Sequence, residues 1–319
     1  MNYRGVNALK GDTRHLCHSL PQRIDLVVGI PRSGLLPANL LCLYLDVPMT
    51  DVTGLCRGEL FETGRRYTES VSFEEFDTVL VLDDSVYSGT QMTETRERLA
   101  DEEFPFDIEY GAIYVTRDSR KYVDHWSEVV PAPRVFEWNV MHHDILRNAC
   151  VDIDGVLCRD PTPAENDDGE NYREFLTQVE PSVVPNRRIG WLVTCRLEKY
   201  REETEAWLNE HGIDYRRLVM MDYPDMETRQ AAGDHAAFKA RVYDEAETKL
   251  FIESTREQAR EICERTGKPV FCYESAELFE PDQTTKIRQN SRSYLSQFYE
   301  NPVGFSQVAI KYLVRQLST

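Results

Sequence analysis

The stretch VLVLDDSVYSGTQM, residues 79–92, decides the fold of the first half of the chain. Its leading apolar residues predict a buried strand, and the residues from Ser85 onward predict a turn into the helix GTQMTETRERLA, 89–100. A buried strand followed by a helix is typical of a parallel sheet that helices cover on both faces. Because ligands of such sheets bind beyond the carboxyl ends of the strands, we expect a binding site at Asp83 and Asp84.

The same alternation of strand and helix surrounds this stretch. The polar and charged residues 57–70 are expected to form a loop. The first half is therefore predicted to be one α/β domain, residues 1–142. Its strands are predicted at IDLVVGI (24–30), VPMTDV (47–52), TVLVLDD (78–84) and IEYGAIYVT (108–116), with a further helix at SGLLPANLLCLYL (33–45).

The pattern then restarts, which predicts a second α/β domain over residues 143–280. NACVDIDGVL (148–157) is predicted to be a strand that runs into a turn. Two helices that end in Gly are predicted at 198–212 and 256–267. The other predicted strands are IGWLVTCR (189–196), KLFIES (249–254) and KPVFCYES (268–275).

Composition excludes several classes of protein. The chain of 319 residues has a net charge of −18, which disfavours bulk attraction to nucleic acid or to an anionic membrane. No apolar run is long enough to span a bilayer, and the N-terminus lacks the apolar core of a signal peptide. A cytoplasmic protein is therefore expected. The eight cysteines show no C-x-x-C pair and no zinc spacing, which predicts reduced, buried thiols.

The last segment differs from the rest in charge. Residues 281–319 hold five basic residues and two acidic ones, and 291–300 and 304–317 are predicted to be helical. One interpretation of this basic helical tail is an interfacial helix at the inner face of the membrane. The alternative is a helix that packs on its own domain or on a second subunit. The sequence does not indicate the oligomeric state.

The chemistry of residues 83–90 points to a sugar phosphate. Small and hydroxyl residues at the start of a helix offer free backbone N–H groups to a phosphate. Asp83 and Asp84 do not favour that anion, and they suit the hydroxyl groups of a sugar diol instead. A vicinal diol beside a phosphate is found in ribose 5-phosphate.

Residues 79–92 resemble the phosphoribosyl-pyrophosphate (PRPP) motif of type I phosphoribosyltransferases, and the resemblance extends over residues 22–118. It implies that the two aspartates hold the ribose hydroxyls. It also implies PRPP-binding roles for Asp83, Asp84, Ser85, Val86, Tyr87, Ser88, Gly89 and Thr90, for Arg32, Ser33 and Gly34 of a pyrophosphate loop, and for Arg65 and Arg66 of a mobile loop. Tyr87 stands where many members have Thr or Asp, a departure that argues against a purine acceptor.

The second domain carries the sequence DIDG, in which Asp152 and Asp154 project two carboxylates from one turn. This sequence resembles the first motif of the haloacid dehalogenase phosphatase superfamily, with a minimally capped Rossmannoid fold. The resemblance implies that Asp152 is a nucleophile that forms an aspartyl phosphate, that Asp154 is its acid and base, and that both bind Mg²⁺. Residues 159–188 are too few for a full cap domain.

The later superfamily motifs follow in order. The resemblance implies a phosphate-binding hydroxyl at Thr194, an added phosphate-binding cation at Arg196, and a third metal ligand at Glu253. Lys239 is our choice for the lysine that stabilises the nucleophile, with Lys249 as the competitor. Ser254, where an Asp is common, is a departure from the pattern.

Together the two resemblances predict a bifunctional enzyme. It would transfer 5-phosphoribosyl from PRPP to an acceptor and then remove the 5-phosphate, which leaves a β-ribofuranosyl group. Such fusions resemble the enzyme pairs that install ribofuranose in bacterial surface polysaccharides, and a lipid-linked glycan hydroxyl is the expected acceptor. Tyr87 and Asp84 are candidates for the base that deprotonates it. Two alternatives stay open: a nucleobase phosphoribosyltransferase coupled to a nucleotidase, and a PRPP-sensing domain that regulates a phosphatase.

Overall fold

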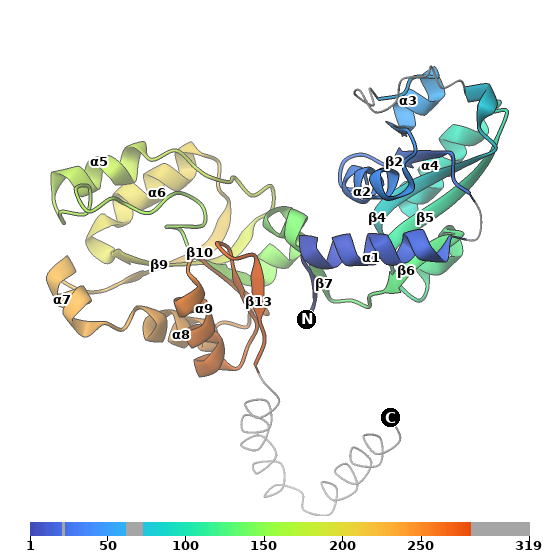
Figure 1. Cartoon of the computed structure of the whole chain (residues 1–319). Coiled ribbons are helices and arrows are strands. Elements are labelled where there is room, and N and C mark those ends of the chain that lie inside the picture. The colour runs from blue at the N-terminus through green and yellow to red at the C-terminus, as the bar shows by residue number, and fades with distance from the viewer. Residues whose placement is uncertain (21–22, 62–72, 282–319) are drawn as a thin grey trace, which may run out of the picture. The chain divides into compact units, whose positions relative to one another are not determined.

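The computed structural model describes residues 1–20, 23–61 and 73–281. Contacts within the chain divide it into two compact units, residues 1–139 and 140–319 (Figure 1). Two parts of the sequence analysis lie outside the described residues: Arg65 and Arg66 of the predicted mobile loop, and residues 282–319 of the basic tail.

The first unit is built on a parallel sheet with the strand order β3-β2-β4-β5-β6. A separate parallel pair joins β1 (Asn2–Arg4) to β7 (Arg134–Phe136). The sheet strands are β2 (Leu26–Gly29), β3 (Met49–Asp51), β4 (Thr78–Val86), β5 (Asp107–Val115) and β6 (His125–Val129).

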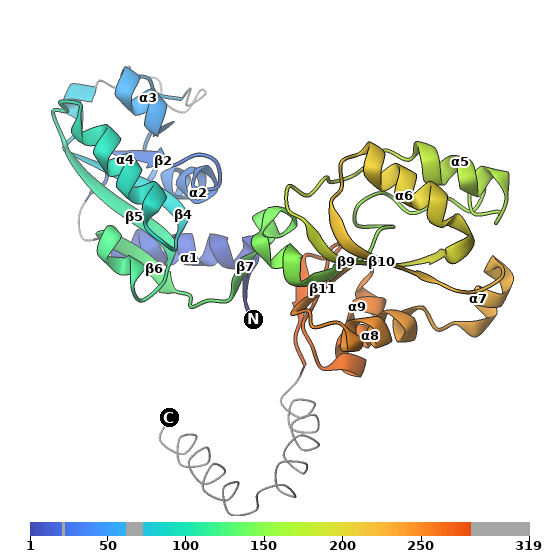
Figure 2. The ribbon, with the colours of Figure 1, turned by 180° about the vertical axis from the view of Figure 1, so that it is seen from behind.

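Helices cover both faces of this sheet, because successive residues of its central strands point to opposite sides. Val27 packs in one apolar cluster with Leu41 of α2, whereas Val28 packs in another with Met92 of α4. Figure 2 shows the same unit from behind. Its helices are α1 (Val6–Ser19), α2 (Leu35–Leu45), α3 (Val52–Arg57) and α4 (Thr90–Ala100), with 3₁₀ turns at Phe73–Glu75 and Ser119–Tyr122.

The second unit has its own sheet, in the order β10-β9-β8-β11-β12-β13, and all neighbours are parallel except β12 and β13. Helices α5 and α6 pack together on one side, and α8 packs with α9 on the other (Figure 1). The strands are β8 (Ala149–Val151), β9 (Ile189–Leu197), β10 (Tyr215–Met221), β11 (Leu250–Glu253), β12 (Val270–Cys272) and β13 (Glu277–Phe279). The helices are α5 (Glu170–Gln178), α6 (Arg201–Glu210), α7 (Met226–Ala232), α8 (His235–Glu245) and α9 (Arg256–Thr266).

Most predicted elements differ from the structure by a few residues at their ends, and two of these differences fall at the start of a helix. Val52, predicted to end a strand, begins α3, where Asp51 caps the helix by accepting a bond of 2.7 Å from the N–H of Gly54. The helix predicted from residue 198 begins as α6 at Arg201, after a 3₁₀ turn at Glu198–Tyr200. The predicted α/β architecture with parallel sheets is confirmed.

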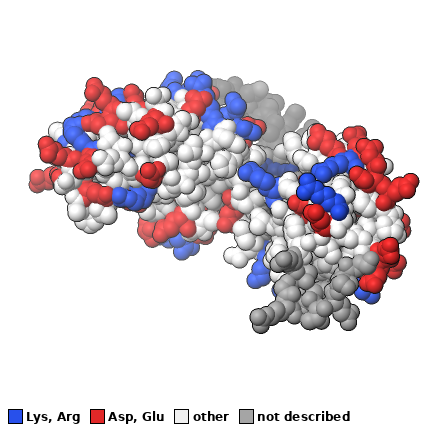
Figure 3. Space-filling model, turned by 90° about the horizontal axis from the view of Figure 1, so that it is seen from above, with Lys and Arg blue, Asp and Glu red and all other residues white. Residues whose placement is uncertain are grey.

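All eight cysteines are free thiols, and five of them are buried. Acidic and basic side chains are interspersed on the face that Figure 3 draws, with groups of acidic side chains along its edges. No helix in the described ranges is both long enough and apolar enough to cross a bilayer.

Candidate active sites

The acid pair of the first unit lies near the end of β4 and is buried: Asp83 is 8% exposed and Asp84 is 3% exposed. Two donors hold the Asp84 carboxylate. Oγ of Ser33 donates to its Oδ1 at 2.7 Å, and the indole N–H of Trp138 donates to its Oδ2 at 2.8 Å. Asp84 is therefore fixed from two distant parts of the chain, the loop after β2 and the 3₁₀ turn Glu137–His142.

Arg134 of β7 is a cation whose charge acts on the pKa of Asp83 in this acid pair. Burial raises the pKa of Asp83, the neighbouring Asp84 raises it further, and the Arg134 guanidinium opposes that shift. The Arg134 guanidinium lies 5.2 Å from the ring centre of Tyr87, and Nη1 of Arg134 is buried without a hydrogen-bond partner in residues 1–20, 23–61 and 73–281. Sequence reasoning missed both Arg134 and Trp138. The only signal for Arg134 was a charged residue between Pro133 and two apolar residues.

The loop after the acid pair is shorter than expected. The sequence predicted a turn from Ser85, but β4 continues to Val86, and Ser85 and Val86 both pair with β5. Their backbone groups form hydrogen bonds within the sheet, so the turn consists of residues 87–89. Gly89, at φ +84°, precedes α4, and the hydroxyls of Ser88 and Thr90 lie 2.9 Å apart.

The predicted pyrophosphate loop lies directly against the acid pair. A Cβ placed on Gly34 would lie 3.0 Å from Cα of Asp83, so the two backbone segments are in contact. The peptide bond between Pro31 and Arg32 is cis, and Arg32 is exposed. The structure thus brings Ser33 and Gly34 to the acid pair.

The second unit holds a chain of buried charges. Nζ of Lys239 lies 2.7 Å from Oδ2 of Asp152 and 2.8 Å from Oε2 of Glu253, and all three side chains are at most 5% exposed. Burial raises the pKa of Asp152, and the Lys239 ammonium opposes that shift. Burial alone would lower the pKa of Lys239, but the two carboxylates raise it above its usual value. The predicted nucleophile and lysine are therefore in contact, whereas Lys249 is exposed elsewhere.

Asp154 and Arg196 form a second ion pair. Nη2 of Arg196 lies 2.7 Å from Oδ1 of Asp154, and its Nε donates to Oδ2 at 3.0 Å. Arg196 is fully buried, so its charge is directed to Asp154, and it does not line the pocket described next. Thr194 is also fully buried, and its Oγ1 accepts from the backbone N–H of Arg196 at 3.2 Å. The phosphate-binding roles of Thr194 and Arg196 stay predictions.

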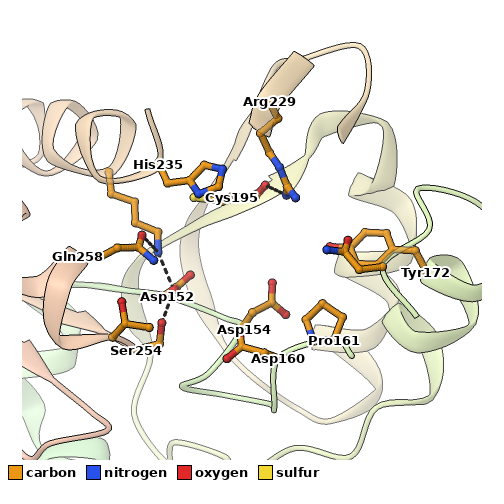
Figure 4. A pocket seen from close by; sticks show the side chains of 13 residues that line it. Asp152, Asp154, Asp160, Pro161, Tyr172, Cys195, Arg229, His235, Ser254 and Gln258 are labelled. Atoms are coloured by element: carbon orange, nitrogen blue, oxygen red, sulfur yellow. Dashed lines mark hydrogen bonds and ion pairs between the residues drawn. The ribbon is translucent and has the colours of Figure 1, made fainter. Parts of the chain in front are cut away.

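A pocket of about 240 Å³ opens at this edge of the sheet (Figure 4). Sequence reasoning missed most of the residues that line it, among them Arg229 of α7 and His235 of α8. His235 stands four residues before Lys239, a spacing that puts both on one helix face once α8 is known. The pocket is lined by Asp152, Asp154, Asp160, Pro161, Asn166, Tyr172, Cys195, Arg229, His235, Lys239, Ser254, Thr255 and Gln258.

The predicted magnesium ligands do not fit as a set. Within the described part of the chain, no group of three or more His, Cys, Asp or Glu side chains is arranged to hold a metal ion. Both oxygens of Glu253 accept from Lys239, and its Oε1 also accepts from Ser254 at 2.9 Å. Glu253 thus acts as the hydrogen-bond acceptor of Lys239. We derive no catalytic step through a metal bound by Asp152, Asp154 and Glu253.

Comparison with known proteins gives matches among solved structures alone: no protein family model and no curated protein matches the sequence. The xanthine-guanine-hypoxanthine phosphoribosyltransferase of Helicobacter pylori aligns over 44% of this chain and 95% of its own, with 15% identity and a TM-score of 0.34. A purine phosphoribosyltransferase from Pyrococcus horikoshii aligns over 43% and 92%, with 19% identity and a TM-score of 0.33. An adenine phosphoribosyltransferase from Rhodothermus marinus aligns over 40% and 77%, with 17% identity and a TM-score of 0.25.

Proposed function

We propose that this chain transfers a 5-phosphoribosyl group from PRPP to an alcohol acceptor in its first unit and removes the 5-phosphate in its second. The observation that carries the proposal is the presence in one chain of two buried acidic centres at strand ends. Asp83 and Asp84 lie beside a helix start, and Asp152 lies against Lys239. The first arrangement suits a sugar phosphate, and the second suits attack on a phosphate ester.

In the first step, the bond between C1 of the ribose and the pyrophosphate oxygen breaks, and a bond from C1 to the acceptor oxygen forms. The acceptor proton leaves to a base. Asp83 and Asp84 accept hydrogen bonds from the ribose hydroxyls, and the N–H groups at the start of α4 face the 5-phosphate. Mg²⁺ accompanies PRPP as part of the substrate. Nη1 of Arg134, which is buried and has no hydrogen-bond partner within the described part of the chain, offers a donor beside the acid pair.

In the second step, a carboxylate oxygen of Asp152 attacks phosphorus, and the bond from phosphorus to the ribose 5-oxygen breaks. The released oxygen takes a proton from Asp154. Water then attacks the phosphorus of the aspartyl phosphate and gives a proton to Asp154. The bond from phosphorus to the Asp152 oxygen breaks, which frees inorganic phosphate and regenerates the Asp152 carboxylate. Arg196 holds the Asp154 carboxylate in place through both oxygens, and Lys239 orients Asp152.

The proposed acceptor is a hydroxyl of a lipid-linked glycan. Tyr87, at the turn after β4, is 61% exposed and carries no carboxylate that could assist a nucleobase. Between β10 and α8, the second unit has only the short helix α7 as an insertion. The tyrosine argues against a nucleobase, and the short insertion leaves room for a large substrate at the second unit. Both features therefore favour a bulky acceptor.

The test is incubation of the protein with PRPP, Mg²⁺ and separate panels of glycan acceptors and free nucleobases, while pyrophosphate release and product mass are followed. The proposal predicts pyrophosphate release only with a glycan acceptor, and a product heavier by one pentose. Release with a nucleobase would favour the nucleotidase alternative. PRPP that alters phosphatase activity without any pyrophosphate release would favour the sensing alternative.

A further inference from the structure

The pocket of the second unit contains two cations, and one of them is already neutralised. Lys239 lies between the carboxylates of Asp152 and Glu253. Arg229 forms no ion pair with a carboxylate within the described part of the chain, so its positive charge at the pocket wall is not paired. A phosphate monoester is a dianion near neutral pH and requires such a charge when it leaves water.

Arg229 is held so that its free donors remain available. Its Nη1 donates to the backbone carbonyl of Cys195 at 2.7 Å, which ties α7 to the end of β9. Its Nε is buried and has no hydrogen-bond partner among the residues that the structure describes. A guanidinium donates in a fixed planar fork, so anchoring one nitrogen also orients the others. The side chain is therefore preorganised, with an unused donor at a pocket that contains the predicted nucleophile.

His235 supplies a second unused nitrogen at the same wall. It begins α8, one helical turn before Lys239, and its Nε2 is buried without a hydrogen-bond partner in the described ranges. Burial lowers the pKa of His235, and the charges of Arg229 and Lys239 lower it further, so the ring is neutral near pH 7. Figure 4 shows Arg229 and His235 on the side of the pocket opposite Asp160 and Ser254. Leaving a buried polar atom unpaired is unfavourable, so two such atoms at one pocket wall favour the binding of a polar ligand there.

We propose that Arg229 and His235 bind the outer phosphoryl oxygens of a phosphate monoester whose phosphorus lies against Asp152. The inference rests on the proposed phosphatase function and names its phosphate-recognition residues. In this arrangement, Arg229 takes the role that the sequence resemblance implied for Arg196, whose charge is directed to Asp154.

The test uses the full-length protein and inorganic phosphate as the probe, with the dissociation constant measured by isothermal titration calorimetry. Arg229→Gln is expected to weaken phosphate binding by roughly 10- to 100-fold, the loss of a charge-assisted contact. Arg229→Lys should restore part of the affinity. His235→Phe keeps a ring and removes both nitrogens, and it should weaken binding roughly 3- to 10-fold. Arg241→Gln is the matched control for the substitution. Arg241 is exposed on α8, the helix of His235, and does not line the pocket.

The outcomes separate this inference from the proposed function. Phosphate binding that is absent in the wild type, or unchanged in both Arg229→Gln and His235→Phe, overturns the inference. Should Arg229→Gln fail to fold, the His235→Phe result decides alone. If phosphate binds through Arg229 but the wild type hydrolyses no ribose 5-phosphate, the proposed phosphatase step fails and this inference stands. If the wild type hydrolyses ribose 5-phosphate and Arg229→Gln leaves KM unchanged, only this inference fails.

Discussion

Nζ of Lys239 lies 2.7 Å from Oδ2 of Asp152, and both side chains are almost completely buried. A buried ion pair is stable only while both partners are present, because removing one leaves an uncompensated charge in a medium of low dielectric constant. The same contact orients the carboxylate that we propose as the nucleophile. Stability and activity of the second unit are therefore linked at one contact.

Lys239→Met is expected to abolish hydrolysis of phosphate esters and to lower the melting temperature. The loss of one partner of a buried ion pair costs about 3–5 kcal/mol, and here two carboxylates, Asp152 and Glu253, lose their cation. Lys249→Met is the control, because Lys249 is exposed. Thermal unfolding and a phosphatase assay measure both effects. Full activity in Lys239→Met would remove Lys239 from the mechanism.

Trp138→Phe is expected to weaken PRPP binding about fivefold. The change removes the indole N–H that holds Oδ2 of Asp84 but preserves an aromatic ring to stack on Phe136. A hydrogen bond to a charged group contributes about 1.5–3 kcal/mol to stability, and Ser33 still holds the other oxygen, so we expect a partial loss. The control is Trp126→Phe on β6. Equal PRPP affinities of the two variants, measured by calorimetry, would contradict the proposed role of Trp138.

Gly89→Ala is expected to cause a larger loss of PRPP binding and melting temperature than Gly58→Ala. Both glycines have positive φ, so both substitutions carry the cost of a left-handed backbone, about 1 kcal/mol. A Cβ at Gly89 would also lie 2.3 Å from the ring of Tyr122, whereas no atom of the described residues lies within 4 Å of a Cβ at Gly58. The difference between the variants therefore measures the steric effect at the turn before α4. No difference would show that the turn tolerates a side chain.

The lowered pKa of His235 predicts that the free energy of unfolding depends on pH. Its pKa in the folded protein is lowered below the ordinary value of 6.5, so between the two values the unfolded chain binds more protons. The wild type should therefore lose stability as the pH falls below 6.5, and His235→Phe should lose less over the same range. Melting temperatures of both proteins at pH 7 and pH 5 measure this. An identical decrease in both would mean that His235 does not contribute.

The buried parts of the fold could be predicted from the sequence, whereas the edges could not. The apolar run VLVL, residues 79–82, predicts β4 because both faces of this sheet are covered and each of these side chains is buried. β10, with the sequence YRRLVMM, was missed because it lies at the edge of its sheet, where exposed positions carry the charged residues Arg216 and Arg217. α1 was missed because its single buried stripe includes Leu9 and Leu16 among many polar residues.

The residues of the candidate sites also fall into two groups, those that could be predicted from the sequence and those that could not. Asp83, Asp84, Asp152 and Lys239 stand in local patterns that the sequence displays. Contacts between distant segments have no such pattern: Trp138 reaches Asp84 across 54 positions, and Arg134 reaches the same region from the short strand β7. Only the folded chain shows these residues as parts of the site.

The most direct test of the whole account is mass spectrometry of the products that wild type and Asp152→Asn form from PRPP and a glycan acceptor. Asp214→Asn, at an exposed aspartate of the second unit, is the control for the substitution. The account predicts a pentose addition with the wild type and with the control. With Asp152→Asn it predicts a product that is heavier by one phosphate. The same dephosphorylated product from all three proteins would contradict it.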